Sequence, residues 1–247
     1  VEATVPVSKF EEGKYLVFVT RNGQIQRNNL MDYSNPRKVG IKAMKIAEGD
    51  ELVTVKMTNG QQEIFIGTRL GMAVRFKESD VRAAGRFTQG VSGVSLQQGD
   101  YVVGAEVLRP GATILTTCEK GYGKRSAIDD YRVIRRGGKG VMNIKMSDRN
   151  GPVVGINEVT DADEVIVITN EGQTIRFRVS DFRVIGRATQ GVRLFNIAEG
   201  DRITAVSRVE PEDEPSAGDD GQQDLLSPGT EEEGGAEAEE NPGDTTQ

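Results

Sequence analysis

A set of residues recurs four times along the chain at a spacing of about 50 residues, and this repeat constrains the fold more than any other feature. Each copy begins with a glycine, and the spacings between the four glycines are 48, 50 and 51 residues: Gly23, Gly71, Gly121 and Gly172. In each copy an Arg lies four residues after the glycine, and an Asp lies nine residues after the same glycine. Such a period, filled with short strands, is typical of a propeller or similar array, so we predict a stack of copied units.

Each unit contains four short runs rich in β-branched and apolar residues. In the first unit these runs begin at Tyr15, Gln24, Gly40 and Glu51. The Arg-Asn-Gly segment that ends at Gly23 is a hairpin signal, because Gly adopts the left-handed conformation that the turn needs. We therefore predict an all-β fold in which about four four-stranded antiparallel blades form a propeller-like array over residues 1–209.

The fourth-strand pattern appears once more at the start of the chain, in residues 1–7. We expect these residues to form a strand at the N-terminal end of the array, as if a longer array were cut inside a preceding unit. The alternative is that this strand completes the last blade and closes the array. The last unit already has a fourth strand of its own, which favours the first interpretation.

Charge divides the chain into two parts. All 31 Lys and Arg lie at or before Arg208, together with 24 of the 38 acids, so residues 1–209 carry about +7. Residues 210–247 carry about −14 and almost no apolar side chains. Such a segment cannot bury enough surface to offset its ordering entropy, so we predict a disordered acidic tail.

The composition excludes several kinds of chemistry. The chain has no His and a single cysteine, Cys118, which removes Cys/His zinc sites, disulfides and His-dependent catalytic sets. We expect Cys118 to be a buried apolar residue, and no cofactor or metal. No signal peptide or membrane-length apolar run is present, so we expect a cytoplasmic location.

The loop before the third run of each unit is basic. The cations are Arg37 and Lys38 in the first unit, Arg82 and Arg86 in the second, Arg132, Arg135, Arg136 and Lys139 in the third, and Arg183 and Arg187 in the fourth. The loop of the third unit also contains paired glycines, which allow backbone N–H groups to approach a phosphate. Equivalent basic loops on one edge of an array favour a rim that binds the backbone of double-stranded DNA.

The repeated Arg and Asp need separate interpretations. We expect the Arg series to add positive charge to one place on each unit. The Asp series, Asp32, Asp80, Asp130 and Asp181, lies on separate units without a second matching carboxylate. Local pairing with the Arg of the same unit, or loop capping, is therefore favoured over a metal or acid/base site.

Several motifs together resemble the C-terminal domain of DNA gyrase A. They are Gly121-Tyr-Gly-Lys-Arg125, Phe76-Lys-Glu-Ser-Asp80, Thr189-Gln-Gly191-Val and the Arg-Arg-Gly-Gly-Lys-Gly run that ends at Gly140. The resemblance covers residues 1–209 and implies a β-pinwheel, a six-bladed disc whose basic rim wraps DNA to support negative supercoiling. It also implies DNA contacts from Lys124 and Arg125, and a complex with the catalytic part of gyrase A and with gyrase B.

Two departures from the family pattern matter. Ile134 stands where the family's box has Gln, and by alignment this loop belongs to the fifth blade, so the chain would contain blades three to six. The catalytic region is absent, so we expect no enzymatic activity from this chain alone. The alternatives are the related C-terminal domain of topoisomerase IV and a propeller-type protein-interaction module, because blade repeats do not specify a ligand.

Overall fold

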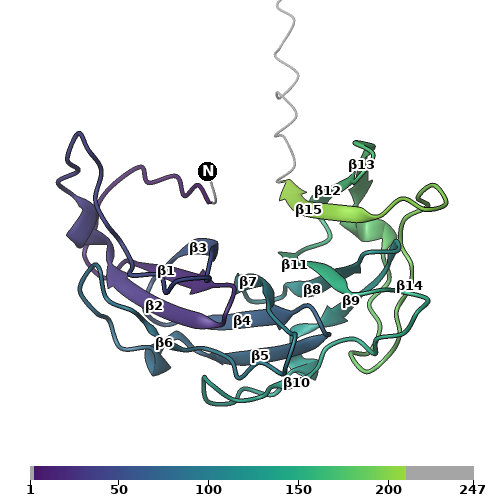
Figure 1. The fold of residues 1–247 in the computed structure, drawn as a ribbon, viewed down its shortest axis with the longest axis horizontal. Coiled ribbons are helices and arrows are strands. Elements are labelled where there is room, and N and C mark those ends of the chain that lie inside the picture. Colours follow the sequence, from purple (N-terminus) through teal and green to yellow (C-terminus); the bar gives the residue numbers. More distant parts are fainter. Residues whose placement is uncertain (1–2, 210–247) are drawn as a thin grey trace, which may run out of the picture. The chain divides into compact units, whose positions relative to one another are not determined.

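The computed structural model describes residues 3–209, which form fifteen β-strands and four single-turn 3-10 helices. No α-helix occurs within this range. Figure 1 shows four sheets that follow one another in chain order. The all-β, propeller-like fold predicted from the repeat is confirmed. The predicted disorder of residues 210–247 concerns a segment outside the described residues.

Each unit begins with a β-hairpin whose turn contains one of the repeated glycines. The hairpins are β1 (Tyr15–Thr20) with β2 (Gln24–Asn29), β4 (Glu63–Thr68) with β5 (Met72–Lys77), β8 (Thr113–Cys118) with β9 (Tyr122–Ala127), and β12 (Glu164–Thr169) with β13 (Thr174–Arg178). The four glycines have φ angles between +80° and +84°, a region that Gly adopts without steric cost. The predicted glycine turns are confirmed.

After each hairpin the chain makes one 3-10 turn and crosses an exposed loop. The turns are η1 (Leu30–Tyr33), η2 (Glu78–Asp80), η3 (Ile128–Asp130) and η4 (Val179–Asp181). In three units the loop leads into a two-residue outer strand: β6 (Val91–Ser92), β10 (Val141–Met142) or β14 (Val192–Arg193). Each unit ends in a seven-residue inner strand, which pairs with the first strand of its own hairpin: β3 (Leu52–Thr58), β7 (Val102–Leu108), β11 (Val153–Val159) or β15 (Ile203–Val209).

The outer strands cross from one unit to the preceding one. The sheet orders are β3-β1-β2-β6, β10-β5-β4-β7, β11-β8-β9-β14 and β13-β12-β15. Three of the four predicted four-stranded sheets are therefore present, and the outer strand of each comes from the following unit. The apolar pattern of a run predicts that it forms a strand, but long-range packing decides which strand it pairs with. The fourth sheet has three strands in the described part of the chain.

Two predicted strands are absent from the N-terminal part. Residues 3–7 have no strand pairing, and residues 1–2 lie outside the description. The run that begins at Gly40 makes only an isolated bridge between Met44 and Thr88. The prediction of an N-terminal strand is thus wrong for residues 3–7. Their valines instead pack against the apolar cluster of the first blade, which includes Leu16 and Phe18.

The hydrophobic core lies between successive blades. One cluster joins Val17 and Ile25 of the first hairpin to Ile64 and Val74 of the second, and includes Val94, which follows the outer strand β6. Equivalent clusters occur at the next two boundaries. Because each core belongs to two blades, the units stabilise one another as in other repeat arrays.

Cys118 is fully buried in the second of these clusters, and burial raises the pKa of its thiol to about 12. The prediction that it is a buried apolar residue is confirmed. A thiol held in this protonated form behaves as a small hydrophobic group.

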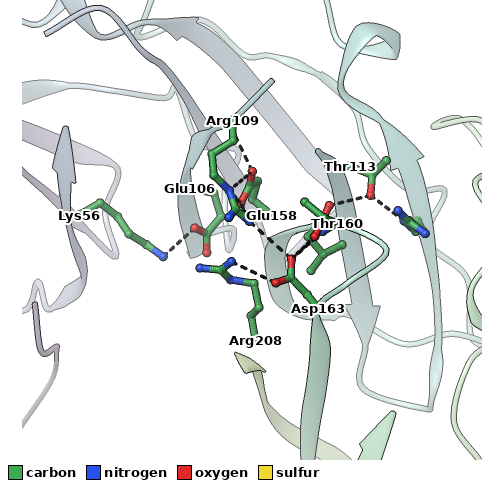
Figure 2. A network of polar contacts seen from close by, with 10 residues as sticks. Lys56, Glu106, Arg109, Thr113, Glu158, Thr160, Asp163 and Arg208 are labelled. Atoms are coloured by element: carbon green, nitrogen blue, oxygen red, sulfur yellow. Dashed lines mark hydrogen bonds and ion pairs between the residues drawn. The ribbon is translucent and has the colours of Figure 1, made fainter. Parts of the chain in front are cut away.

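Ion pairs connect neighbouring inner strands (Figure 2). Lys56 of β3 lies 2.6 Å from the Glu106 carboxylate of β7. Arg109, which follows β7, contacts Glu158 of β11 at 2.8 Å. Burial raises the pKa of Glu106, while the ammonium group of Lys56 favours its charged form. These contacts join neighbouring blades through side chains, in addition to the shared core.

Candidate nucleic-acid interface

The basic loops predicted to bind an anion are exposed in the structure. We call residues 35–39, 82–89, 132–139 and 183–190 the outer loops. Eight of the predicted cations are exposed: Arg37, Lys38, Arg82, Arg86, Arg132, Arg135, Lys139 and Arg183. Arg136 and Arg187 are half-buried, and the remaining two, Lys124 and Arg125, are buried.

Three of the outer loops are fixed to the preceding blade in the same way. The backbone N–H of Ala84, Ile134 or Ile185 donates to the carbonyl oxygen of the repeated Arg, at 2.8 Å in each case. A parallel bridge accompanies each bond. Since each bond joins one unit to the blade before it, the loops occupy equivalent places on consecutive blades. The exposed arginines therefore recur at regular positions along the array.

Arg136 and Arg187 link successive outer strands and loops. The Arg136 guanidinium donates to the carbonyl oxygens of Asp80 at 2.9 Å and Ser92 at 3.0 Å. Arg187 repeats the second contact one unit later, because its Nη1 donates to the Met142 carbonyl oxygen at 2.8 Å. A guanidinium has five N–H donors, so both side chains hold the rim in place and retain donors for a phosphate.

Gly137 in the third outer loop and Gly140 directly after it are needed for packing. The N–H of Gly137 donates to the Gly93 carbonyl oxygen at 2.7 Å, so it is not available to a phosphate. A Cβ atom on Gly140 would lie 2.2 Å from the Ala73 carbonyl oxygen. Of the paired glycines, Gly137 and Gly138, the interpretation as a phosphate-approach residue is therefore wrong for Gly137. Close contact with the neighbouring blade explains Gly140.

The prediction that Lys124 and Arg125 contact DNA is also wrong. Lys124 has no exposed surface, and its Nζ donates to Ser126 Oγ and to the Tyr131 hydroxyl. Burial lowers the pKa of Lys124 to about 7. Arg125 is 5% exposed. Both residues lie on β9 under the outer loops, where they support the loops and cannot reach a ligand.

In the first three units the side chain of the repeated Arg connects its own blade to the next one. Nη1 of Arg75 donates to the carbonyl oxygens of Ile128 at 2.8 Å and Tyr131 at 3.0 Å, in the next unit. Arg125 makes the equivalent contacts with the fourth unit, at 3.4 Å, and an ion pair with Asp161. Arg27 reaches the second unit through Glu78, at 3.2 Å. The expectation that this series adds charge to the rim is thus replaced by a structural role.

The repeated Asp residues lie at or near the end of the 3-10 turns and are partly or fully exposed. Within residues 3–209 none of them forms an ion pair with the repeated Arg of its own unit, so that predicted pairing is wrong. No group of three or more acidic or thiol side chains in this range could hold a metal ion.

Sequence reasoning missed further exposed cations next to the outer loops. Lys42, Lys45, Lys145 and Arg193 are all exposed. Arg193 lies on β14, and its Nη2 donates to the Tyr122 hydroxyl at 2.9 Å. A sequence signal for two of these cations was available. The third run of each unit starts with a Gly, and the position two residues after that Gly is Lys42 in the first unit and Arg193 in the fourth.

Comparison with known proteins identifies the repeat. The family described as "DNA gyrase C-terminal domain, beta-propeller" matches residues 14–59, 62–109, 113–159 and 163–210. Each matched segment runs from a hairpin to the inner strand of the same unit. The chain is 43% identical to DNA gyrase A of Chlamydia muridarum over 211 residues, and 43% identical to that of Escherichia coli over 215 residues.

These matches cover 85% and 87% of the chain but 25% of each relative, so the chain spans about a quarter of their length. The similarity lies in the C-terminal domain, and the catalytic region of gyrase A is not part of this chain. No helix in residues 3–209 is long and apolar enough to cross a membrane.

Solved structures share the fold. The crystal structure of the C-terminal domain of DNA topoisomerase IV has a TM-score of 0.78 and 27% identity, covering 83% of this chain and 65% of that one. The structure of the DNA gyrase A C-terminal domain has a TM-score of 0.75 and 24% identity, covering 83% and 69%. Together with the match over all four units, these findings confirm the predicted resemblance: the chain belongs to the DNA gyrase C-terminal domain family.

Proposed function

We propose that this chain is a non-catalytic module that binds duplex DNA on its outer loops and bends it to support negative supercoiling. The observation that carries this proposal is the equivalent placement of three basic loops on consecutive blades, each with exposed arginines. DNA is a polyanion with regularly spaced charge, which a regular row of cations suits. Residues 1–209 also carry about +7, which attracts DNA over longer distances.

The binding residues in this proposal are the exposed and half-exposed cations of the outer loops. They are Arg37, Lys38, Arg82, Arg86, Arg132, Arg135, Arg136, Lys139, Arg183 and Arg187, joined by Lys42 and Arg193. Contacts to phosphates are favoured over base readout, because residues 3–209 contain no α-helix that could enter the major groove. The partners would be DNA, the catalytic part of gyrase A and gyrase B, in the bacterial cytoplasm at the nucleoid.

Salt dependence of DNA binding tests the proposal. If about six phosphates are neutralised, the slope of log K against log salt is near −5 for a duplex of any sequence. Replacing Arg132, Arg135 and Lys139 by Ala should flatten the slope by up to about three units, if each contacts one phosphate. An affinity that does not depend on salt, or a strong preference for one sequence, would contradict phosphate binding and favour a protein-interaction module.

A charge-matched control separates loop contacts from net charge. Arg21, Arg69 and Arg202 line a hollow of about 500 Å³ beside the hairpin turns, and each pairs with a Glu. Replacing these three by Ala removes the same charge from another part of the surface. We expect the slope of this variant to stay within about one unit of the wild-type slope. If the slope flattens equally in both variants, DNA binding depends only on the overall charge of the protein.

A further inference from the structure

Phe87, in the second outer loop, combines a strained backbone with an exposed aromatic ring. Its φ angle is +58°, and among residues 3–209 it is the only residue other than Gly with a positive φ angle. This left-handed conformation costs free energy for a bulky side chain. The ring is nevertheless 51% exposed, so its burial in the fold offsets little of that cost.

The loop needs a left-handed backbone at this position, but it does not need a Phe. Phe87 lies three residues before the Gly that starts the third run of its unit, and the same position in the third unit is Gly137, with a φ angle of +74°. The backbone bonds correspond as well. The Phe87 N–H donates to the Ala43 carbonyl oxygen and the Gly137 N–H to the Gly93 carbonyl oxygen, both at 2.7 Å. Since Gly adopts this conformation without strain, a strained Phe in its place points to a function.

The unit that packs against the second outer loop is part of the structure. Among residues 3–209, the hydrogen bonds that the third and fourth outer loops make with another unit go to the unit directly before them. For the second outer loop this is the first unit. The three atoms nearest to a Cβ on Gly137 likewise all belong to Ser92, in the unit directly before. The exposure of Phe87 is therefore a property of the loop in its packed position.

Three cations surround the Phe87 ring. Arg37, Lys42 and Arg86 line a hollow of about 550 Å³ together with the ring, and all three are exposed. Lys42 Nζ lies 5.1 Å from the ring centroid, within the range of a cation–π interaction. Within the described part of the chain, no acidic residue lines this hollow. The site thus presents an apolar surface in the middle of positive charge.

We propose that the Phe87 ring packs on a deoxyribose of bound duplex DNA. Arg37, Lys42 and Arg86 then contact the phosphates on either side of that sugar. The DNA backbone alternates anionic phosphates with sugars that have an apolar C–H face, and an apolar ring among cations matches this pattern. Sugar contacts carry no sequence information, so this contact agrees with binding to a duplex of any sequence. The inference rests on the proposed function, because it concerns DNA held on the outer loops.

Salt dependence separates this neutral contact from the charged ones. Phe87→Gly removes the ring but no charge, so the number of counterions released on binding stays the same. We expect its DNA affinity to fall about fivefold to tenfold at every salt concentration, with an unchanged slope of log K against log salt. Arg86→Ala should instead flatten the slope by about one unit. Leu70→Ala is the matched control, because Leu70 is 38% exposed on the hairpin turn of the same unit, and it should bind DNA like the wild type.

The stability of the same variant tests for a merely structural role. Because Gly fits the left-handed conformation, the urea midpoint of Phe87→Gly should be at least equal to that of the wild type, while its DNA affinity falls. A lower midpoint together with a lower affinity would mean that the ring stabilises the loop and does not contact DNA, which would overturn the proposal.

A tryptophan substitution reports the sugar contact directly, because the chain has no Trp of its own. In Phe87→Trp, duplex DNA should shift the indole emission to shorter wavelength, since the ring leaves water. Inorganic polyphosphate has phosphates but no sugars, so it should bind the cations without this shift. Leu70→Trp should show no shift with either polyanion. An equal shift of Phe87→Trp with polyphosphate, or a shift with polyglutamate and none with DNA, would overturn the proposal.

These outcomes separate the inference from the proposed function. If the wild type shows no salt-dependent affinity for DNA, the proposed function fails, and the sugar contact fails with it. If the wild type binds DNA with the expected slope and Phe87→Gly binds it with the same affinity, only the sugar contact is overturned.

Discussion

Nη1 of Arg75 donates to the Tyr131 carbonyl oxygen at 3.0 Å, across the boundary between the second and third blades. The same guanidinium contacts Glu63 of its own hairpin at 2.6 Å through Nε. One side chain therefore braces a hairpin and fixes the next blade to it. The bond explains why the Arg recurs at a constant distance from the turn glycine, independently of any ligand.

We predict that Arg75→Ala destabilises the chain by about 2–3 kcal/mol, because buried hydrogen bonds to a charged group are lost and two carbonyl oxygens are left unpaired. Arg176→Ala is the matched control. Arg176 has the same repeat position and the same kind of contact, with Glu164, but it is exposed and has no following blade in the described residues.

The control should cost less than about 1 kcal/mol. Urea denaturation of the two variants and the wild type measures both costs. Equal costs would show that the contact within the hairpin, and not the link between blades, explains the repeated Arg.

A second prediction concerns the buried amine of Lys124. Burial lowers the pKa of Lys124 to about 7, against about 10.4 in an unfolded chain. Between these values the unfolded state binds more protons, so stability due to this group rises with pH. Relative to Lys124→Met, the wild type should gain up to about 1.4 kcal/mol per pH unit above pH 7.

Denaturation at pH values from 7 to about 8.5 measures this difference. The Cys118 thiol, whose pKa in the unfolded chain is about 8.5, is present in both proteins, so its ionisation cancels in the difference between them. A difference between wild type and Lys124→Met that stays constant with pH would show that Lys124 keeps its proton in the folded state.

The sequence predicted the units well because their strongest signals are local. The turn glycines, the hairpins and the basic loops all depend on residues close together in the chain, and the structure contains them. The partner of the third run could not be predicted in this way. Val91 pairs with Ile25, 66 residues earlier, and the apolar pattern of either strand is equally compatible with pairing inside one unit.

The site was predicted in part for the same reason. Charged residues on loops, such as Arg132 and Lys139, are exposed as expected. Lys124 and Arg125 lie on β9, where the blade that packs over them decides their burial. A charged residue at a strand position facing a neighbouring unit cannot be distinguished from a ligand contact without knowing which units touch.

A third prediction concerns DNA topology. Bending a site of 20–30 bp by 40–90° costs about 1–6 kcal/mol, which only several spaced contacts can offset. This chain supplies four units, whereas the family resemblance implies six in the complete domain. Circles closed by ligase in its presence should therefore show a smaller shift in linking number than circles closed with a six-bladed relative. A shift of equal size would show that four units are sufficient for the full wrap.

A fourth prediction concerns the acidic segment, residues 210–247, which carries about −14 beside a body of about +7. Because it is tethered to the body, we expect it to compete with DNA for the basic loops at a high effective concentration. Deleting it should raise DNA affinity well beyond twofold at low salt, and the gain should shrink as salt screens the attraction. A variant with the same length but with its Asp and Glu replaced by Asn and Gln separates charge from bulk, and should bind DNA as tightly as the deletion. If all three proteins bind DNA equally at low ionic strength, the segment does not compete for the loops, and solubility is the better account of its charge.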